Sequence, residues 1–337
     1  MPDVAGLQTR IEITTTHETE DWVNQVSWAP DGSEVYAACA DGAVLAVPAR
    51  GDGGIREVHR HEGAATCLSI SPDGVIASGG HDGTVRVDGR TTRLGEGDWI
   101  ERVTWRPDGG RIAAACGRSV YLLGVDGTPE AESSPLGATV TCLAWHPKGV
   151  NVAAGSYGGV KVLRGRDGTL ATELPWKGSV LELTVSPDGR RLAHGNQDST
   201  VHFWDIAKKR ELHMWGYETK VRELAWRHDG RFLATGGGSS ITIWDFSGKG
   251  PEGSRPLELD QHAAPVSWLG FRPANRMLAS VAGDGMLVLW ETRASGPVVS
   301  AVAFDEPLSV ASWSPDGKRI AVGGTGGTVG ICEVLEA

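Results

Sequence analysis

The sequence lacks the features that mark several large protein classes. Its 337 residues include 32 Lys and Arg but 42 Asp and Glu, a net charge of −10, so it has no excess of basic residues for phosphate contacts. No apolar run approaches the roughly 20 residues of a membrane-spanning helix. The first residues show no basic stretch followed by an apolar one. We therefore expect a cytoplasmic protein with no nucleic-acid and no membrane partner, monomeric by itself.

Cysteines are few and catalytic motifs are missing. The five cysteines are an odd number without metal-ligand spacing, which predicts reduced, buried thiols. No phosphate-binding glycine loop precedes a helix, and no arrangement of Ser, His and Asp marks a nucleophile. His59 and His61 alternate along one segment, so a metal site there is a minor alternative. We expect no catalytic residue, no metal and no cofactor, although an enzyme is not excluded at this point.

What the sequence does have is a repeat. A large apolar residue, one further residue and then Pro-Asp-Gly or a variant recur eight times, at a spacing of about forty residues. The 47 glycines are roughly twice the usual share of about 7%, as expected for many tight turns between short strands. A period near forty with several strands per unit is typical of a propeller blade. The turns start at Pro30, Pro72, Pro107, Pro147, Pro187, His228, Pro273 and Pro315.

Each unit predicts a four-stranded antiparallel meander. In the fifth, residues 180–186 alternate apolar and polar, Pro187-Asp188-Gly189 turns the chain, and three more short strands follow. The first strand of each unit carries two apolar residues with a small one between them, and both apolar residues are large except in unit eight, which has Ala311; an innermost strand near a crowded axis requires such a pattern. The second apolar residue, called the anchor here, is Trp28, Ile70, Trp105, Trp145, Val185, Trp226, Phe271 or Trp313.

These units resemble the WD-repeat family of β-propellers. Trp204-Asp205 and Trp244-Asp245 end their units with the dipeptide that gives the family its name. The resemblance implies a structural hydrogen-bond network, which unit seven matches with His262, Ser280, Asp284 and Trp290. Unit two matches in part, with His61, Ser78 and Asp82. The resemblance extends over roughly residues 10–333 and is specific to the fold, which hosts many functions.

We predict an all-β protein, a single WD-repeat β-propeller domain over residues 1–337. Eight inner-strand motifs predict eight four-stranded blades, with seven blades as the alternative. The chain stops after the third strand of the last unit, whereas a spare strand over residues 10–15 precedes the first. We expect this spare strand to close the ring, because a closed ring leaves no exposed sheet edge.

Candidate binding residues are those that the repeat does not need. In the family that the sequence resembles, the loop before the first strand and the second hairpin lie on one face. Aromatic and Arg side chains on a rigid rim make strong binding contacts. Trp22 and Trp99 hold equivalent loop positions in two units, each after an Asp, although packing against neighbouring blades explains them almost as well. The candidates are Trp22, Asn24, His81, Trp99, Glu101, Tyr157, Gln197, Lys220 and Arg222.

Two functions remain open from the sequence. The first is a non-catalytic scaffold that binds a protein or peptide on the face of Trp22 and Trp99. The second is a ligand-binding protein or enzyme that uses the central channel, with His81, Glu101, Tyr157 and Arg222 as polar groups.

Overall fold

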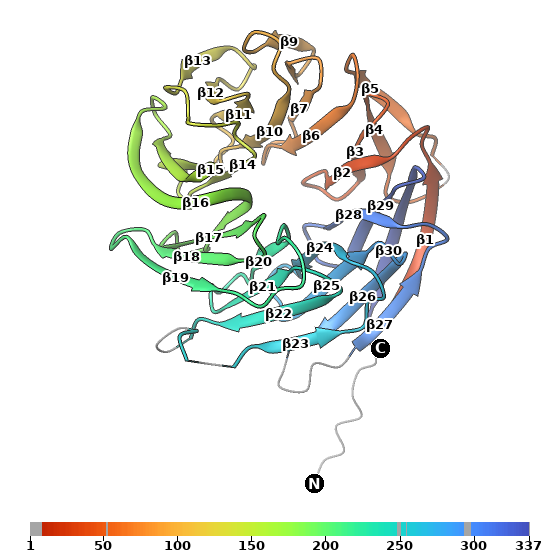
Figure 1. Ribbon diagram of the computed structural model, residues 1–337. Coiled ribbons are helices and arrows are strands. Elements are labelled where there is room, and N and C mark those ends of the chain that lie inside the picture. Colours follow the sequence, from red (N-terminus) through yellow and green to blue (C-terminus); the bar gives the residue numbers. More distant parts are fainter. Residues whose placement is uncertain (1–8, 52, 248–250, 254, 293–297, 337) are drawn as a thin grey trace.

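The computed structural model describes residues 9–51, 53–247, 251–253, 255–292 and 298–336. Every regular element in these ranges is a β-strand, and the strands form a ring of antiparallel sheets (Figure 1). None of the described elements is a helix with the length and apolarity needed to cross a bilayer. We number the repeat units one to eight by their anchors and give their strands in that order.

Units one to three each form a four-stranded sheet in sequence order. Unit one contains β2 (Val23–Trp28), β3 (Glu34–Cys39), β4 (Ala43–Pro48) and β5 (Arg56–Arg60). Unit two contains β6 (Ala65–Ile70), β7 (Ile76–Gly80), β8 (Thr84–Val87) and β9 (Arg90–Arg93). Unit three contains β10 (Ile100–Trp105), β11 (Ile112–Cys116), β12 (Ser119–Leu123) and β13 (Pro129–Glu132).

Units four and five share one strand and so form one six-stranded sheet. Its strands are β14 (Cys142–Trp145), β15 (Asn151–Arg164), β16 (Leu170–Val185), β17 (Arg191–Asn196), β18 (Val201–Asp205) and β19 (Arg210–Met214). The first half of β16 pairs with β15, and its second half pairs with β17. The outer strand of unit four therefore continues without a break into the inner strand of unit five.

Units six to eight again form four-stranded sheets. Unit six contains β20 (Leu224–Trp226), β21 (Phe232–Gly236), β22 (Ser240–Asp245) and β23 (Leu257–Asp260). Unit seven contains β24 (Val266–Phe271), β25 (Met277–Ala282), β26 (Met286–Glu291) and β27 (Val298–Ala303). Unit eight contains β28 (Leu308–Trp313), β29 (Arg319–Gly324) and β30 (Thr328–Leu335), and β1 (Arg10–Glu18) is its fourth strand.

The number of sheets corrects the prediction of eight separate blades. The described strands form seven sheets, which is the alternative count, because the unbroken β16 joins two units into one sheet. The eight anchor motifs still lie on eight inner strand segments. Contacts between neighbouring inner strands run from β2 through β6, β10, β14, β16, β20, β24 and β28 back to β2.

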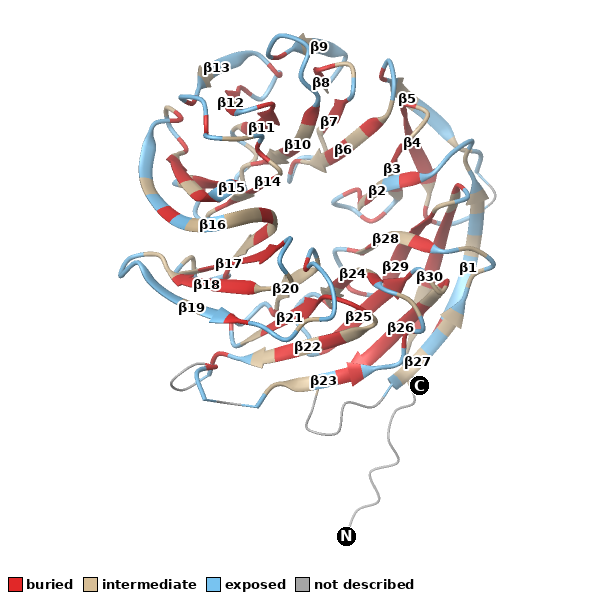
Figure 2. Cartoon of the chain, in the orientation of Figure 1, coloured by how far each residue is buried: buried red, intermediate tan, exposed pale blue. Residues whose placement is uncertain are grey.

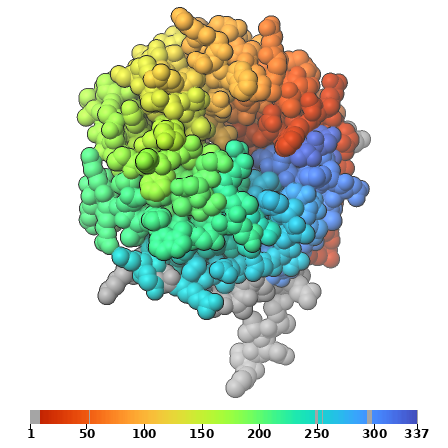
Figure 3. Space-filling model, in the orientation of Figure 1, coloured from red at the N-terminus to blue at the C-terminus, as the bar shows by residue number. Residues whose placement is uncertain are grey.

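The ring closes between the two ends of the described chain. β1 pairs antiparallel with β30 over the whole of its length, from Arg10 opposite Leu335 to Glu18 opposite Thr328. The segment expected to close the ring, residues 10–15, lies within β1, which runs along the outer edge beside β30 (Figure 1). In the space-filling view the earliest and latest described residues meet at one side of the disc (Figure 3).

The alternation of large and small residues on the inner strands places the core between neighbouring sheets. Three of the five anchor indoles donate a hydrogen bond to the preceding unit, among them Trp28 Nε1 to Ser312 O at 2.9 Å and Trp145 Nε1 to Thr104 O at 3.1 Å. Each acceptor residue is the small one before its own anchor, so a neighbouring ring can approach the backbone there. Buried residues accordingly concentrate on the inner and middle strands, whereas the outermost strands are more exposed (Figure 2).

Candidate functional site

The loops that carry Trp22 and Trp99 lie on one face of the ring. The Ala40 N–H, in the second hairpin of unit one, donates to Trp22 O at 2.8 Å. In unit three Asp98 lies equally close to the second hairpin, since a Cβ added at Gly117 would be 2.4 Å from an Asp98 carboxylate oxygen. Each loop therefore contacts the second hairpin of its own unit, and this end of the ring is called the hairpin face here.

Both indoles are half-exposed on the hairpin face. Trp22 is 47% and Trp99 is 53% exposed, which agrees with the expected exposure and leaves neither ring in the core. The imidazole of His81, from the hairpin of unit two, stacks on Trp99 with ring centroids 4.1 Å apart and planes 25° apart. The stacking holds one indole in a fixed orientation. Trp22 makes no ring contact with Trp99, so they are two separate points on the rim.

Glu101 and Asn24 lie near these indoles and have different surroundings. Burial raises the pKa of the half-buried Glu101 carboxyl, an effect that the charges of Arg102 and His81 oppose. The structure thus brings His81, Trp99 and Glu101 together. Asn24 donates through Nδ2 to Ala65 O at 2.9 Å, a bond that joins units one and two, so its amide already has a structural role.

The remaining candidates lie further round the ring. Tyr157 is 58% exposed, and the exposed Gln197 donates from its backbone N–H to Ser179 O at 3.0 Å. Lys220 and Arg222 are exposed in the segment before β20. No hydrogen bond, ion pair or ring contact within the described ranges joins these four side chains to Trp22 or Trp99. They are additional points on the hairpin face, spread over units four to six.

The inner strands also carry charged side chains, two of which pair with each other. Arg102 Nη2 lies 2.7 Å from Glu182 Oε2, so an ion pair reaches from unit three to unit five. The attraction of Glu182 raises the pKa of Arg102, although burial opposes it. Burial also raises the pKa of Glu223 to about 7. Because Arg102 and Glu182 neutralise each other, this region offers little free charge to a channel ligand.

Comparison with known proteins decides the family. The sequence profile described as "WD domain, G-beta repeat" matches six segments that together make up more than half of the chain: residues 9–45, 54–87, 133–163, 165–205, 209–245 and 253–291. The chain belongs to the WD40 repeat family.

The WD40 relatives are distant in sequence. Subunit 3 of the THO complex from Arabidopsis thaliana is 24% identical over 233 residues, which cover 66% of this chain and 72% of that protein. Protein HIR1 from Yarrowia lipolytica is 27% identical over 192 residues, which cover 47% of this chain and only 18% of that longer protein. A chain in the crystal structure of the mitotic checkpoint complex has a TM-score of 0.68 at 23% identity, covering 80% of this chain and 86% of that chain. This last likeness shows the fold alone.

The WD40 hydrogen-bond network predicted for unit seven is confirmed. His262 Nδ1 contacts the Asp284 carboxylate at 3.1 Å, and its Nε2 contacts Ser280 Oγ at 2.8 Å. Trp290 Nε1 donates to the same Ser280 Oγ at 2.8 Å. Four side chains, from the loop, the second hairpin and two strands, are thereby joined behind the hairpin face, which stiffens the rim.

The partial WD40 network of unit two is also present, with an unexpected partner. His61 Nδ1 contacts Asp82 at 3.1 Å and His61 Nε2 contacts Ser78 Oγ at 2.8 Å. His59 Nε2, from the outer strand of unit one, contacts the same Ser78 Oγ at 2.6 Å. Both imidazoles thus bind one hydroxyl, and the residues that the structure describes contain no group of three His, Cys, Asp or Glu able to hold a metal ion.

Two exposed features of this WD40 ring were not found from the sequence. Trp215 is 73% exposed at the outer edge of unit five, more than either rim indole. In the sequence, Trp215 is marked only as a tryptophan that is neither an anchor nor part of a Trp-Asp dipeptide. The second feature is a cleft on the face opposite the hairpins, and it depends on how neighbouring units pack.

The five cysteines are all buried and unbonded, as predicted.

Proposed function

We propose that this WD40 protein is a non-catalytic scaffold that binds a protein or peptide partner on its hairpin face, through Trp22 and Trp99. The observation that carries the proposal is the pair of half-exposed indoles at equivalent positions of units one and three. Large aromatic side chains that are already partly ordered contribute much of the binding free energy in protein interfaces. A soluble rim has little reason to expose two of them without a partner.

Preorganisation supports Trp99 as the stronger contact. Its indole is stacked on His81, so binding would cost little further side-chain entropy. Glu101 lies beside this pair and can accept hydrogen bonds from a partner, with a proton affinity raised by burial. Trp22 has no such ring partner and would gain order only in the complex. The two indoles are therefore unequal contributors to the proposed interface.

The comparisons support a protein partner without naming it. One relative is named as a subunit of the THO complex, and the structural neighbour belongs to the mitotic checkpoint complex. Both are proteins in assemblies with other chains. The ring found here offers a rigid face of loop ends that suits such a role, and the fold itself hosts many functions.

The experiment uses the full chain with paired tryptophan substitutions. Affinity purification with quantitative mass spectrometry identifies partners of the wild type, and titration calorimetry measures their affinity. The double variant Trp22→Ala/Trp99→Ala should weaken binding by more than about 2 kcal/mol, roughly thirtyfold in Kd. Trp215→Ala is the control, because it removes an exposed indole at the outer edge of unit five.

Comparison of the two variants distinguishes binding at the hairpin face from nonspecific binding through an exposed indole. Partners that survive Trp215→Ala and are lost from the double variant support the hairpin face. If the double variant keeps the wild-type affinity, or if Trp215→Ala weakens binding as much, the proposed site is wrong. Unchanged melting temperatures in both variants exclude unfolding as the cause.

A further inference from the structure

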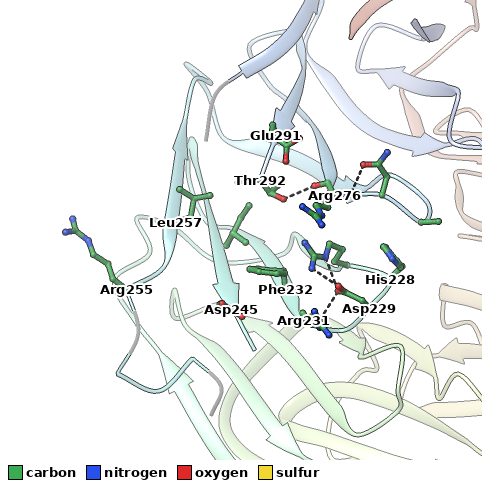
Figure 4. A pocket seen from close by; sticks show the side chains of 14 residues that line it. His228, Asp229, Arg231, Phe232, Asp245, Arg255, Leu257, Arg276, Glu291 and Thr292 are labelled. Atoms are coloured by element: carbon green, nitrogen blue, oxygen red, sulfur yellow. Dashed lines mark hydrogen bonds and ion pairs between the residues drawn. The ribbon is translucent and has the colours of Figure 1, made fainter. Parts of the chain in front are cut away.

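A cleft opens between units six and seven on the face opposite the hairpins. It has a volume of about 900 Å³. Its walls come from the turn after β20, the turn after β24 and the ends of β22 and β26 (Figure 4). The turn residues His228 and Asp229 lie on one side, and Asn275 and Arg276 lie on the other. Because the strands are antiparallel, these turns lie at the other end of the strands from Trp22 and Trp99.

The cleft is open because no arginine among the residues that the structure describes crosses it. In units three and eight the residue six positions after the anchor is an arginine whose side chain reaches the next unit. Arg111 donates to Gly165 O at 2.9 Å, and Arg319 donates to Gly32 O at 2.8 Å. Unit six has Phe232 at this position, and a phenyl ring cannot make such a bond.

A second arginine that crosses to the next unit elsewhere in the ring stays within its own unit in unit six. The residue after the anchor crosses to the next unit in unit seven, where Arg272 Nε donates to Gly317 O at 2.7 Å. Its equivalent Arg227 instead binds Asp229 of its own turn, with Nη2 to Oδ2 at 2.6 Å, and lies 4.1 Å above the Phe232 ring. Between units three and four, where Arg111 does cross, the equivalent cleft measures only about 460 Å³.

Unpaired guanidinium groups line the opening. Arg231 and Arg276 are exposed, and neither forms an ion pair with any residue in the described ranges. Figure 4 shows Phe232 near the centre of the view, with Arg276 above it and Arg231 below it. Four arginines and three carboxylates line the cleft. Asp229 binds Arg227, Asp245 accepts a hydrogen bond from the Ser247 N–H at 2.7 Å, and the third carboxylate is the half-buried Glu291. In a chain of net charge −10, this is a local site for an anion.

We propose that this cleft binds an acidic segment of a partner protein, rich in Asp and Glu. Guanidinium groups pair with carboxylates through two parallel hydrogen bonds, and Arg231 and Arg276 offer two such groups across one opening. Phe232 and Leu257 line the cleft as well and suit apolar side chains between the acids. A nucleic acid fits less well, because a continuous phosphate backbone needs a broad basic surface, and the chain has a net charge of −10.

The probe is a short fluorescein-labelled peptide of alternating Glu and Leu, measured by fluorescence anisotropy at low salt with the full chain. Wild-type protein should bind it saturably. Arg231→Glu/Arg276→Glu should weaken binding at least tenfold, because each substitution replaces an attraction with a repulsion. The same peptide with Gln in place of Glu should not bind.

A matched control exists on the same face. Arg190 and Lys318 hold the turn positions of units five and eight that Arg231 and Arg276 hold in units six and seven, and neither lines the cleft. The Arg190 and Arg231 N–H groups each donate to the Asp two residues earlier, at 3.0 and 3.1 Å. Arg190→Glu/Lys318→Glu therefore changes the net charge equally and should leave the affinity within twofold of the wild type.

Each other outcome overturns the assignment. Equal weakening in both double variants would show a general charge effect, and absence of saturable binding to the wild type would show no site. A single-stranded oligonucleotide that binds more tightly than the peptide, and depends on Arg231 and Arg276, would assign the cleft to nucleic acid instead. Trp22→Ala/Trp99→Ala should not affect the peptide, so this test is independent of the hairpin face. Arg231→Gln/Arg276→Gln repeats the test without introducing negative charge.

Discussion

Units five and seven each bury a tryptophan in the third strand, and they supply the hydrogen-bond acceptor for its indole N–H in different ways. In unit seven, Trp290 donates to a hydroxyl, Ser280 Oγ, which His262 and Asp284 hold in place from the loop and the hairpin. In unit five, Trp204 Nε1 donates at 3.1 Å to the ring of His194. The comparison teaches that the third-strand indole needs an acceptor, whereas the residue that supplies it can change; in unit six Trp244 Nε1 donates to the Tyr217 hydroxyl at 2.9 Å, from the loop before the first strand.

The exchange follows from strand register. Ser280 lies opposite Leu269 of the inner strand, and His194 lies opposite the equivalent Leu183. A histidine at this position is long enough to reach the indole by itself, so unit five needs no loop histidine. Its Nδ1 contacts Asn196 Oδ1 at 2.9 Å, which leaves Nε2 as the acceptor.

The histidine of unit five also begins a stack that unit seven lacks. His194, His202 and His213 face one another across β17, β18 and β19, with centroids 5.1 and 5.0 Å apart and planes only 7° apart. Trp176 covers His202 with a centroid distance of 3.8 Å. Unit seven therefore relies on a loop histidine held by a carboxylate, whereas unit five relies on stacked rings, of which His202 also contacts the Glu211 carboxylate.

The largest expected effect is the loss of the acceptor in unit five. His194→Ala should cost about 3–4 kcal/mol of unfolding free energy, because it leaves the Trp204 N–H unpaired and opens a cavity beside His202. Urea denaturation at pH 7 measures it. His213→Ala, in the exposed member of the stack, should cost less than about 1 kcal/mol. Similar losses in both variants would contradict the role given to His194.

Removal of the carboxylate of unit seven should cost somewhat less. Asp284→Ala deprives His262 and two backbone N–H groups, those of Ala263 and Met286, of their acceptor, so we expect a loss of about 1–3 kcal/mol. Asp41→Ala is the matched change in unit one, where the carboxylate accepts one backbone N–H and forms an ion pair with the exposed Arg60. It should cost less than about 1 kcal/mol in the same assay. Equal costs would mean that the network adds nothing to the turn.

The smallest effect is a difference in acid sensitivity. Burial lowers the pKa of His194 to about 3, whereas an unfolded histidine titrates near 6.5. The folded state therefore stays neutral while the unfolded state takes up a proton, and stability falls as the pH drops below about 6.5, by about 1.4 kcal/mol per pH unit for such a residue.

Two glutamine variants test this difference between the units. His194→Gln should flatten the fall in melting temperature between pH 6.5 and pH 5. His262→Gln should change the slope less, because Asp284 opposes the effect of burial on the pKa of His262. A steeper slope in His194→Gln would show that His194 is charged in the folded protein.

The repeat made most of the fold predictable. The anchors, the Pro-Asp-Gly turns and the spare strand over residues 10–15 are local patterns, and each forms the expected strand or turn. The number of sheets was not predictable in the same way. The sequence of β16 gives no sign that the outer strand of unit four continues into unit five, because that continuity depends on the path between two packed units.

For the candidate binding residues, too, some features are local to one unit and others depend on how neighbouring units pack. The sequence singled out Trp22 and Trp99 as residues that the repeat does not need but left packing against neighbouring blades as an almost equal explanation, and the structure places both indoles half-exposed. The stacking of His81 on Trp99 joins two units, and so does the use of the Asn24 amide by Ala65 O. Such contacts depend on how neighbouring sheets are placed, which the residues of one unit do not record.

The sequence by itself determined the repeat, the all-β class and the propeller architecture, because these follow from short-range periodicity and turn chemistry. The network of unit seven was implied by the resemblance to the WD-repeat family. Only the tertiary structure decided which arginines cross between units and which turn back. Arg227 and Arg272 hold the same repeat position, yet one binds its own turn and the other binds the next unit. The open cleft between units six and seven follows from that difference together with Phe232, which stands where Arg111 and Arg319 cross in their own units. A guanidinium group can bind only the acceptors that the assembled ring brings within reach.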